Sequence, residues 1–231
     1  MINFKKVLIV VAHPDDEVLG CGGIMQLFLK NNIKFKIIIL GEGSSCRFNA
    51  KEINSKKVKK IIAQRQDFAK KSFKVLGAKD YLFHDFPCGR FDSIPIIDIG
   101  KFIEHIIDEF KPDTLITHSE NDTNSDHRIV FNAVNTATRP TPTCIVKNVL
   151  TFEIPSSSEW RFIETFKPNL FIDISKFIER KIDAFECFFE TEGRPFPFPR
   201  SREGLLTYAK FRGLQSGYKY SEAFRIIRSS I

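Results

Sequence analysis

Short apolar runs alternate with longer amphipathic segments over the first two thirds of the chain. The runs are rich in Val, Ile, Leu and Phe, which is typical of buried strands, and they cover residues 7–12, 35–40, 81–86, 114–117 and 149–154. The segments between them have helical spacing and cover residues 23–30, 50–76, 96–110 and 127–138. This alternation predicts an α/β fold, in which helices cover both faces of a mostly parallel central sheet.

The pattern changes after about residue 155. We expect a strand at 169–175, a helix at 176–190 and a last helix at 201–216, whereas the three prolines of RPFPFPRS (194–201) exclude regular structure. The sequence has no internal repeat, no low-complexity linker and no composition shift that marks a boundary. We therefore predict one domain, residues 1–231, in which about 155–231 complete the substrate pocket.

Composition and charge narrow the class of protein. The chain has 231 residues, 42% of them hydrophobic, with 35 basic and 28 acidic side chains and a net charge of +7. Such an excess is compatible with an anionic partner, although much of it lies in 51–60, which reads as a solvated helix face. The five cysteines are scattered and include no CxxC pair, which argues against a disulfide framework or a thiolate zinc site. No apolar run reaches the roughly 20 residues of a membrane span, so we expect a cytoplasmic protein.

The first chemical motif is HPDDE (13–17), which directly follows a predicted buried strand. Three adjacent carboxylates repel one another, and a dication would compensate that repulsion. Imidazole and carboxylate groups are good ligands for zinc and related ions, so His13 and Asp16 are candidate ligands. Asp15 would then stand beside the ion, where a carboxylate acts as a general base. The alternative is a solvated turn with an aspartate cap.

The second motif is THSENDTNSDHR (117–128), which also follows a predicted strand and so belongs at the same edge of the sheet. His127 is a candidate third ligand, and two histidines with one carboxylate make an open catalytic zinc site. Asp126, Asp122 and His118 are placed to orient ligands, and Asn124 to hold a substrate oxygen. The alternative is a polar loop that caps a helix.

With these motifs the chain resembles the LmbE / PIG-L family of metal-dependent de-N-acetylases. The resemblance extends to GEGSSCR (41–47), GRFDSIPIIDI (89–99), TATRP (136–140), FEIPSSSEW (152–160) and RGLQSGYKYSEAF (212–224). It implies a Rossmann-like three-layer sandwich, one zinc ion per chain and removal of acetyl groups from N-acetylglucosamine-type sugars. Some relatives have histidines where this chain has Asn124 and Phe198, and Cys88 stands where we expect a polar residue.

The resemblance also assigns roles to residues of this sequence. The family's metal ligands match His13, Asp16 and His127, and its general base matches Asp15. Weaker candidates for substrate contact or ligand support are Arg65, Asp92, Asn124, Asp126 and Arg47.

We therefore expect a zinc-dependent hydrolase, with Fe²⁺ as another candidate ion, that removes an N-acetyl group from an amino sugar, free or linked to a nucleotide or lipid. Two other readings stay open at this point. One is a metal-dependent phosphoesterase, although such sites commonly hold two ions. The other is a non-catalytic nucleotide- or polyanion-binding module. The expected partner is a small amino sugar, without nucleic acid or a membrane span, and a homo-oligomer is compatible with the sequence.

Overall fold

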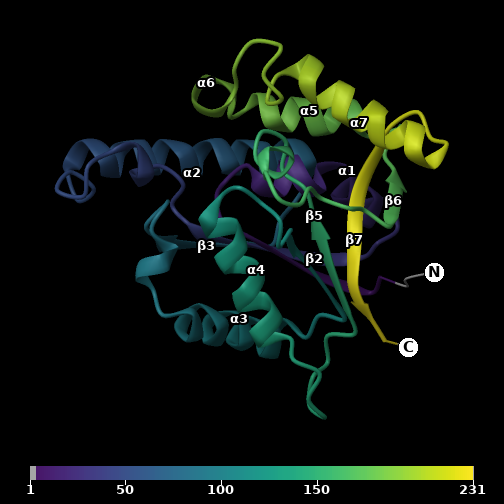
Figure 1. The fold of residues 1–231 in the computed structure, drawn as a ribbon, viewed down its shortest axis with the longest axis horizontal. Coiled ribbons are helices and arrows are strands. Elements are labelled where there is room, and N and C mark those ends of the chain that lie inside the picture. Colours follow the sequence, from purple (N-terminus) through teal and green to yellow (C-terminus); the bar gives the residue numbers. More distant parts are fainter. Residues whose placement is uncertain (1–3, 231) are drawn as a thin grey trace.

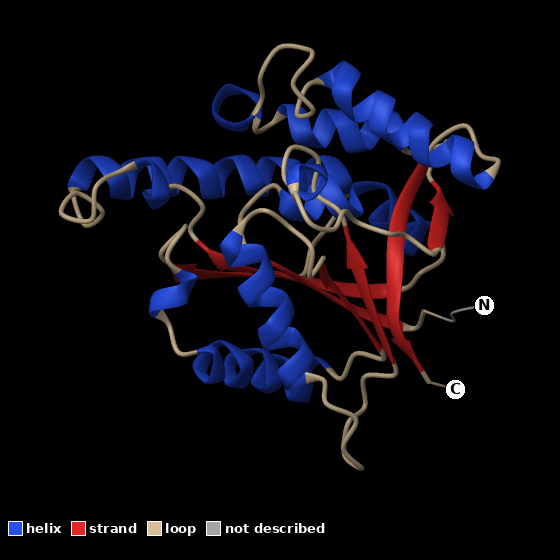
Figure 2. Ribbon diagram, viewed as in Figure 1, coloured by secondary structure: helices blue, strands red, loops and turns tan. Residues whose placement is uncertain are grey.

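Seven strands form one central sheet, and helices cover both of its faces (Figures 1 and 2). The computed structural model describes residues 4–230. The strands are β1 (Lys6–Val11), β2 (Lys34–Gly41), β3 (Tyr81–Phe86), β4 (Thr114–His118), β5 (Asn148–Phe152), β6 (Leu170–Asp173) and β7 (Ser221–Ser229), in the order β3-β2-β1-β4-β5-β7-β6. β1 to β5 are parallel, whereas β7 is antiparallel to β5 and β6. The predicted α/β sandwich with a mostly parallel sheet is confirmed.

The helices divide between the two faces of the sheet. They are α1 (Asp16–Lys30), α2 (Lys56–Leu76), α3 (Ile96–Phe110), α4 (Ser125–Ala137), α5 (Ile178–Glu186), α6 (Phe189–Glu192) and α7 (Arg202–Ser216), with short 3-10 helices η1 (Ser45–Arg47), η2 (Phe91–Ser93) and η3 (Ser158–Trp160). α3 and α4 lie on one face, and α1, α2, α5 and α7 lie on the other (Figure 1). Within residues 4–230, no helix combines the length and the apolar character needed to cross a bilayer.

Two hydrophobic cores hold these layers together. The larger core contains Phe28, Phe73 and Phe185, none of them more than 1% exposed, between the sheet and helices α1, α2 and α5. The smaller core contains Ile103 and Val130 beneath α3 and α4. Burial of apolar area is the main favourable contribution to folding, so these two cores hold the helices against both faces of the sheet. The edge of this sheet carries the polar motifs.

The structure corrects two predicted helix boundaries and adds one strand. α2 begins at Lys56 and not at residue 50, because the hydroxyl of Ser55 caps the helix by accepting a hydrogen bond from Val58 N (3.3 Å). α1 begins at Asp16 and not at residue 23. β7 was not predicted, because Glu222 and two arginines interrupt the apolar pattern of residues 221–229.

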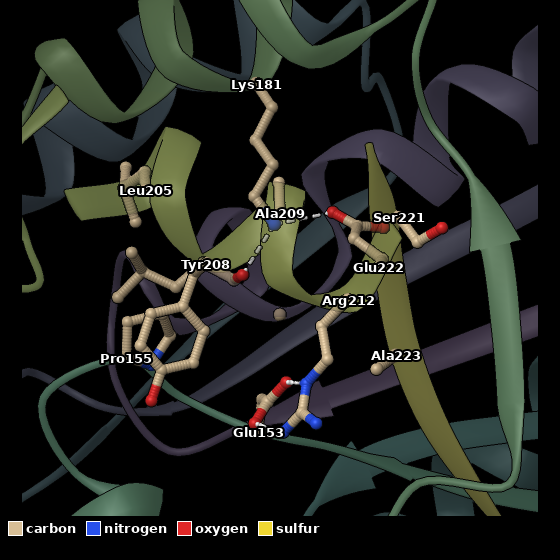
Figure 3. A pocket seen from close by; sticks show the side chains of 12 residues that line it. Glu153, Pro155, Lys181, Leu205, Tyr208, Ala209, Arg212, Ser221, Glu222 and Ala223 are labelled. Carbon is tan, nitrogen blue, oxygen red and sulfur yellow. Dashed lines mark hydrogen bonds and ion pairs between the residues drawn. The ribbon is translucent and has the colours of Figure 1, made fainter. Parts of the chain in front are cut away.

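Within α1, the GCGG sequence (20–23) packs against a buried ion pair. Here the side chains of Lys181 and Glu222 point toward one another, 2.7 Å apart (Figure 3). Lys181 Nζ donates to the Leu19 carbonyl, and the Glu222 carboxylate accepts from the backbone N–H groups of Gly23 and Ile24, each over 2.7 Å. A Cβ on Gly23 would stand 2.4 Å from an Ile174 side-chain atom, so glycine allows the close approach. A buried ion pair therefore braces α1 from behind the HPDDE turn.

Candidate active site

The two polar motifs meet at one edge of the sheet. β1 pairs in parallel with β4, so the residues that follow Val11 and His118 leave the sheet side by side. In the sheet, β2 and β3 lie on one side of β1, and β4 and β5 lie on the other. The strand order therefore reverses between β1 and β4. Ligands of open α/β sheets bind at such points, outside the carboxyl ends of the strands.

The HPDDE motif forms the turn between β1 and α1. His13 N donates to Asp16 Oδ2 over 2.8 Å, and Asp16 N donates to the His13 carbonyl over 3.3 Å. Asp15 has a φ of 115°, which residues with a Cβ rarely adopt. Backbone strain of this kind costs roughly 1–3 kcal/mol and concentrates at functional sites. The turn is thus a strained feature that the surrounding contacts must hold in place.

His13, Asp16 and His127 form the predicted ligand cluster. One potential ligand atom from each lies within 4.8 Å of the others, and all three side chains are buried. Asp16 Oδ2 is 3.3 Å from His127 Nε2 and 3.6 Å from His13 Nδ1. Two imidazoles and one carboxylate are the donors of open catalytic zinc sites. The donor set therefore fits one divalent cation.

Asp122 supports the His127 side of this cluster. Asp122 Oδ1 is 3.2 Å from His127 Nδ1, and the carboxylate accepts hydrogen bonds from the hydroxyls of Ser157 and Ser158. Burial alone raises the pKa of Asp122, but His127 and the two serines hold it well below its usual range. A carboxylate behind a ligating histidine fixes the orientation of the ring. The serines were missed in the sequence, although SSS follows the strand that ends at Phe152.

Asp126 supports the His13 side. His13 Nε2 lies 2.9 Å from Asp126 Oδ2, and the same carboxylate accepts from the backbone N–H groups of Gly89 (2.6 Å) and Phe91 (3.2 Å). Cys88 is buried beside it, and the ligand atoms of His13, Cys88 and Asp126 also lie within 4.8 Å of one another. His13 is therefore shared between two groups of donors.

His118 is stacked on His127, with ring centroids 3.9 Å apart. Its Nε2 accepts a hydrogen bond from Ala12 N over 2.9 Å, so the ring carries its proton on Nδ1. Burial, together with the neighbouring His127, lowers the pKa of His118 to about 3. His118 is therefore a neutral packing partner that keeps the His127 ring in its plane.

Two arginines flank Asp15. Asp15 Oδ1 is 3.3 Å from Arg65 Nη2, and Asp15 Oδ2 is 3.1 Å from Arg200 Nη1. Burial is the largest influence on the pKa of Asp15 and raises it, while the two arginines counteract that effect, so that the pKa stands at about 6. A carboxylate with a pKa near the working pH is suited to general base catalysis. Arg200 was not singled out from the sequence, although it lies in the FPRS stretch.

The acid next along the motif behaves differently. Glu17 is fully buried, and its Oε2 accepts from Asp15 N over 3.1 Å. Burial first, and then repulsion by Asp15, raise the pKa of Glu17 to about 8. At neutral pH, Glu17 is mainly protonated, which removes one negative charge from the HPDDE turn.

Glu192, at the end of α6, links the arginines into one network. Its carboxylate lies 2.8 Å from Arg65 Nη1 and 2.6 Å from Arg47 Nη2. Arg65 also donates to the Pro14 carbonyl over 2.9 Å. Segments from the first and last thirds of the chain thus converge on Asp15, and the basic side chains here are already partnered by carboxylates.

Two weaker candidates are placed differently. The side-chain oxygen of Asn124 accepts from Asp126 N over 2.9 Å, so Asn124 is the cap of α4, the alternative reading of this loop. Asp92 is exposed on η2. Among the described residues, Asp92 has no hydrogen bond or ion pair to the ligand cluster.

Comparison with known proteins gives concordant matches. The model of the PIG-L family, described as GlcNAc-PI de-N-acetylase, matches residues 8–138. Diacetylchitobiose deacetylase from Thermococcus kodakarensis is 26% identical over 237 residues, which cover 97% of this chain and 84% of that protein.

Solved structures share the fold at lower identity. The structure of N,N'-diacetylchitobiose deacetylase from Pyrococcus horikoshii has a TM-score of 0.76 and 22% identity, covering 98% of this chain and 85% of that chain. GalB, the 4-carboxy-2-hydroxymuconate hydratase from Pseudomonas putida, has a TM-score of 0.75 and 21% identity, covering 98% of each chain. Since these two have different activities, the fold alone does not determine the reaction.

Proposed function

Because the chain belongs to the PIG-L family of de-N-acetylases, we propose that it removes an N-acetyl group from an amino sugar of the N-acetylglucosamine type in a metal-dependent hydrolysis. The family match confirms the predicted membership and the expected class of enzyme, an N-deacetylase. The observation that carries the proposal is the position of Asp15, held by two arginines beside the cluster of His13, Asp16 and His127.

The cation in this proposal is zinc, with Fe²⁺ as the second candidate. His13, Asp16 and His127 would hold it, and Asp122 and Asp126 would orient the two imidazoles. When bound, such an ion polarises a carbonyl group and lowers the pKa of a water molecule, from 15.7 to about 7 in a favourable site.

The remaining chemistry is assigned to side chains of this chain. Asp15 takes a proton from water as the water oxygen attacks the acetyl carbon. Asp15 then returns that proton to the nitrogen as the C–N bond breaks, so that the products are acetate and a free amine. Arg65 and Arg200 keep Asp15 ionised near neutral pH and fix its direction.

The family match favours this reaction over the two rival readings, a phosphoesterase and a polyanion-binding module. The deciding experiment measures acetate released from free, nucleotide-linked and lipid-linked N-acetylglucosamine by the zinc-loaded protein, with phosphate release from aryl phosphates assayed in parallel. Acetate release with at least one of these sugars supports the proposal. Phosphate release without acetate release overturns it, and so does the absence of both activities from a fully metallated, folded protein.

A further inference from the structure

The two ring nitrogens of His13 face two different carboxylates. Nδ1 lies 3.6 Å from Asp16 Oδ2, on the side of the proposed catalytic cation. Nε2 lies 2.9 Å from Asp126 Oδ2, on the opposite side of the ring. The ring is buried, with 5% of the residue exposed. One imidazole therefore stands between two carboxylates, of which only Asp16 is a proposed ligand of the catalytic cation.

A thiol completes a second set of donors on the Nε2 side. The sulfur of Cys88 and ligand atoms of His13 and Asp126 lie within 4.8 Å of one another, and all three residues are buried. Sulfur, imidazole nitrogen and carboxylate oxygen together favour Zn²⁺ and softer ions of similar geometry over Mg²⁺ or Ca²⁺. This set differs from the His13–Asp16–His127 cluster because it contains sulfur.

The backbone around Cys88 is fixed. Cys88 N donates to Glu42 Oε1 over 2.8 Å, and the next residue, Gly89, donates its N–H to Asp126 Oδ2 over 2.6 Å. Gly89 has a φ of +71°, and a Cβ there would stand 2.8 Å from Cys46 Cβ. The turn therefore requires glycine, and it fixes the backbone that carries the Cys88 thiol beside the Asp126 carboxylate.

We propose that Cys88, Asp126 and the Nε2 side of His13 form a second, inhibitory cation site for a sulfur-preferring divalent ion, such as Zn²⁺ in excess or Cd²⁺. On binding, Cys88 Sγ and His13 Nε2 each release a proton to solvent. The ion replaces the hydrogen bond between His13 and Asp126 that orients the ring. Loss of such outer contacts typically lowers metal affinity or activity by about 10- to 100-fold. The inhibition rests on the proposed deacetylase function, whereas the binding does not.

Cobalt titration of the full chain tests the binding directly. Thiolate bound to Co²⁺ gives an intense near-ultraviolet charge-transfer absorption, which a site with only nitrogen and oxygen donors does not give. We expect this band in the wild type, with two Co²⁺ per chain at saturation. Cys88→Ser should abolish the band and leave one Co²⁺ per chain. Cys144→Ser is the control, because it removes a thiol that contacts the carbonyls of Thr138 and Val146. This variant should keep the absorption band and bind two Co²⁺ per chain.

The outcomes separate this proposal from the proposed function. A wild type that saturates without the band, or a band that persists in Cys88→Ser, overturns the second site. Cys88→Ala, with circular dichroism of each variant, guards against a folding defect specific to serine. In activity assays, Zn²⁺ beyond one equivalent should inhibit the wild type about tenfold or more and Cys88→Ser much less. If no variant releases acetate, the proposed function fails, while the cobalt band still decides the cation site.

Discussion

Arg200 Nη1 lies 3.1 Å from Asp15 Oδ2, although 185 residues separate them in the sequence. Arg200 Nε also donates to Ser156 Oγ over 2.7 Å, so the guanidinium joins the proline-rich segment, the loop after β5 and the HPDDE turn. The C-terminal third of the chain therefore places a charged group against the proposed base.

Replacement of Arg200 should shift the pH dependence of catalysis. Arg200 lowers the pKa of Asp15, so Arg200→Ala should let burial raise that pKa above about 6. Because the base acts when ionised, the acidic limb of kcat/KM should then move to higher pH. A pH profile measures this shift, with Arg202→Ala as the control, since Arg202 is exposed and pairs with Glu179 and Glu186. An unmoved acidic limb would show that Arg200 does not tune the base.

Glu17 should make the protein less stable at alkaline pH. Its pKa is raised to about 8 in the fold, whereas an unfolded glutamate titrates near 4.5. The folded state therefore binds the Glu17 proton more tightly than the unfolded state does, and protonation of Glu17 stabilises the fold. This contribution to the free energy of unfolding is fully present below about pH 4.5 and is lost as the pH rises through 8. Glu17→Gln removes this dependence. Thermal unfolding from pH 6 to 9 should show Tm falling more steeply for the wild type, and parallel curves would contradict the assignment.

Breaking the buried Lys181–Glu222 pair should destabilise the protein strongly. Glu222→Gln leaves the Lys181 ammonium buried without its carboxylate, and breaking such a pair typically costs about 3–5 kcal/mol. Denaturant unfolding should show a loss of this size. Glu164→Gln, which removes an exposed pair with Lys167, should leave the midpoint unchanged. Similar midpoints for the two variants would mean that the pair does not brace α1.

Ser158→Ala should weaken cation binding without removing a ligand. Ser158 Oγ donates to Asp122 Oδ2 over 2.7 Å, and Asp122 in turn contacts His127. Loss of such outer contacts typically lowers metal affinity about 10- to 100-fold. Competition with a chelator measures the affinity. Ser175→Ala is the control, because this half-buried serine donates to Asp173 and has no contact with Asp122 or the proposed ligands. An equal affinity in wild type and Ser158→Ala would exclude this role for the serine.

Much of the fold followed from the sequence because its signals are local. The strands that carry the motifs are nearly continuous apolar runs, and the carboxyl ends of neighbouring parallel strands share an edge. The structure accordingly brings together His13, Asp16 and His127, the ligands expected from HPDDE and the later DHR. β7 was not predictable in this way, since its buried Glu222 is stabilised by a lysine 41 residues earlier in the chain.

The parts of the site that escaped prediction depend on long-range contacts. Glu192 forms ion pairs with Arg65 and Arg47, which precede it in the sequence by 127 and 145 residues respectively. The pattern of apolar and polar residues along the chain does not predict such distant pairs. Asn124 shows the opposite case, because its oxygen caps α4 as local sequence chemistry predicts. Sequence reasoning thus found the groups proposed to do chemistry and missed several that position them.

The most direct test of the central claim compares acetate release by wild type and Asp15→Asn, each loaded with zinc and normalised to its measured metal content. We predict about one catalytic zinc per chain in both proteins. Acetate release by Asp15→Asn should be about 10²- to 10⁴-fold slower, the usual contribution of a general base. An Asp15→Asn protein that keeps its zinc and hydrolyses the sugar at nearly the wild-type rate would contradict the account.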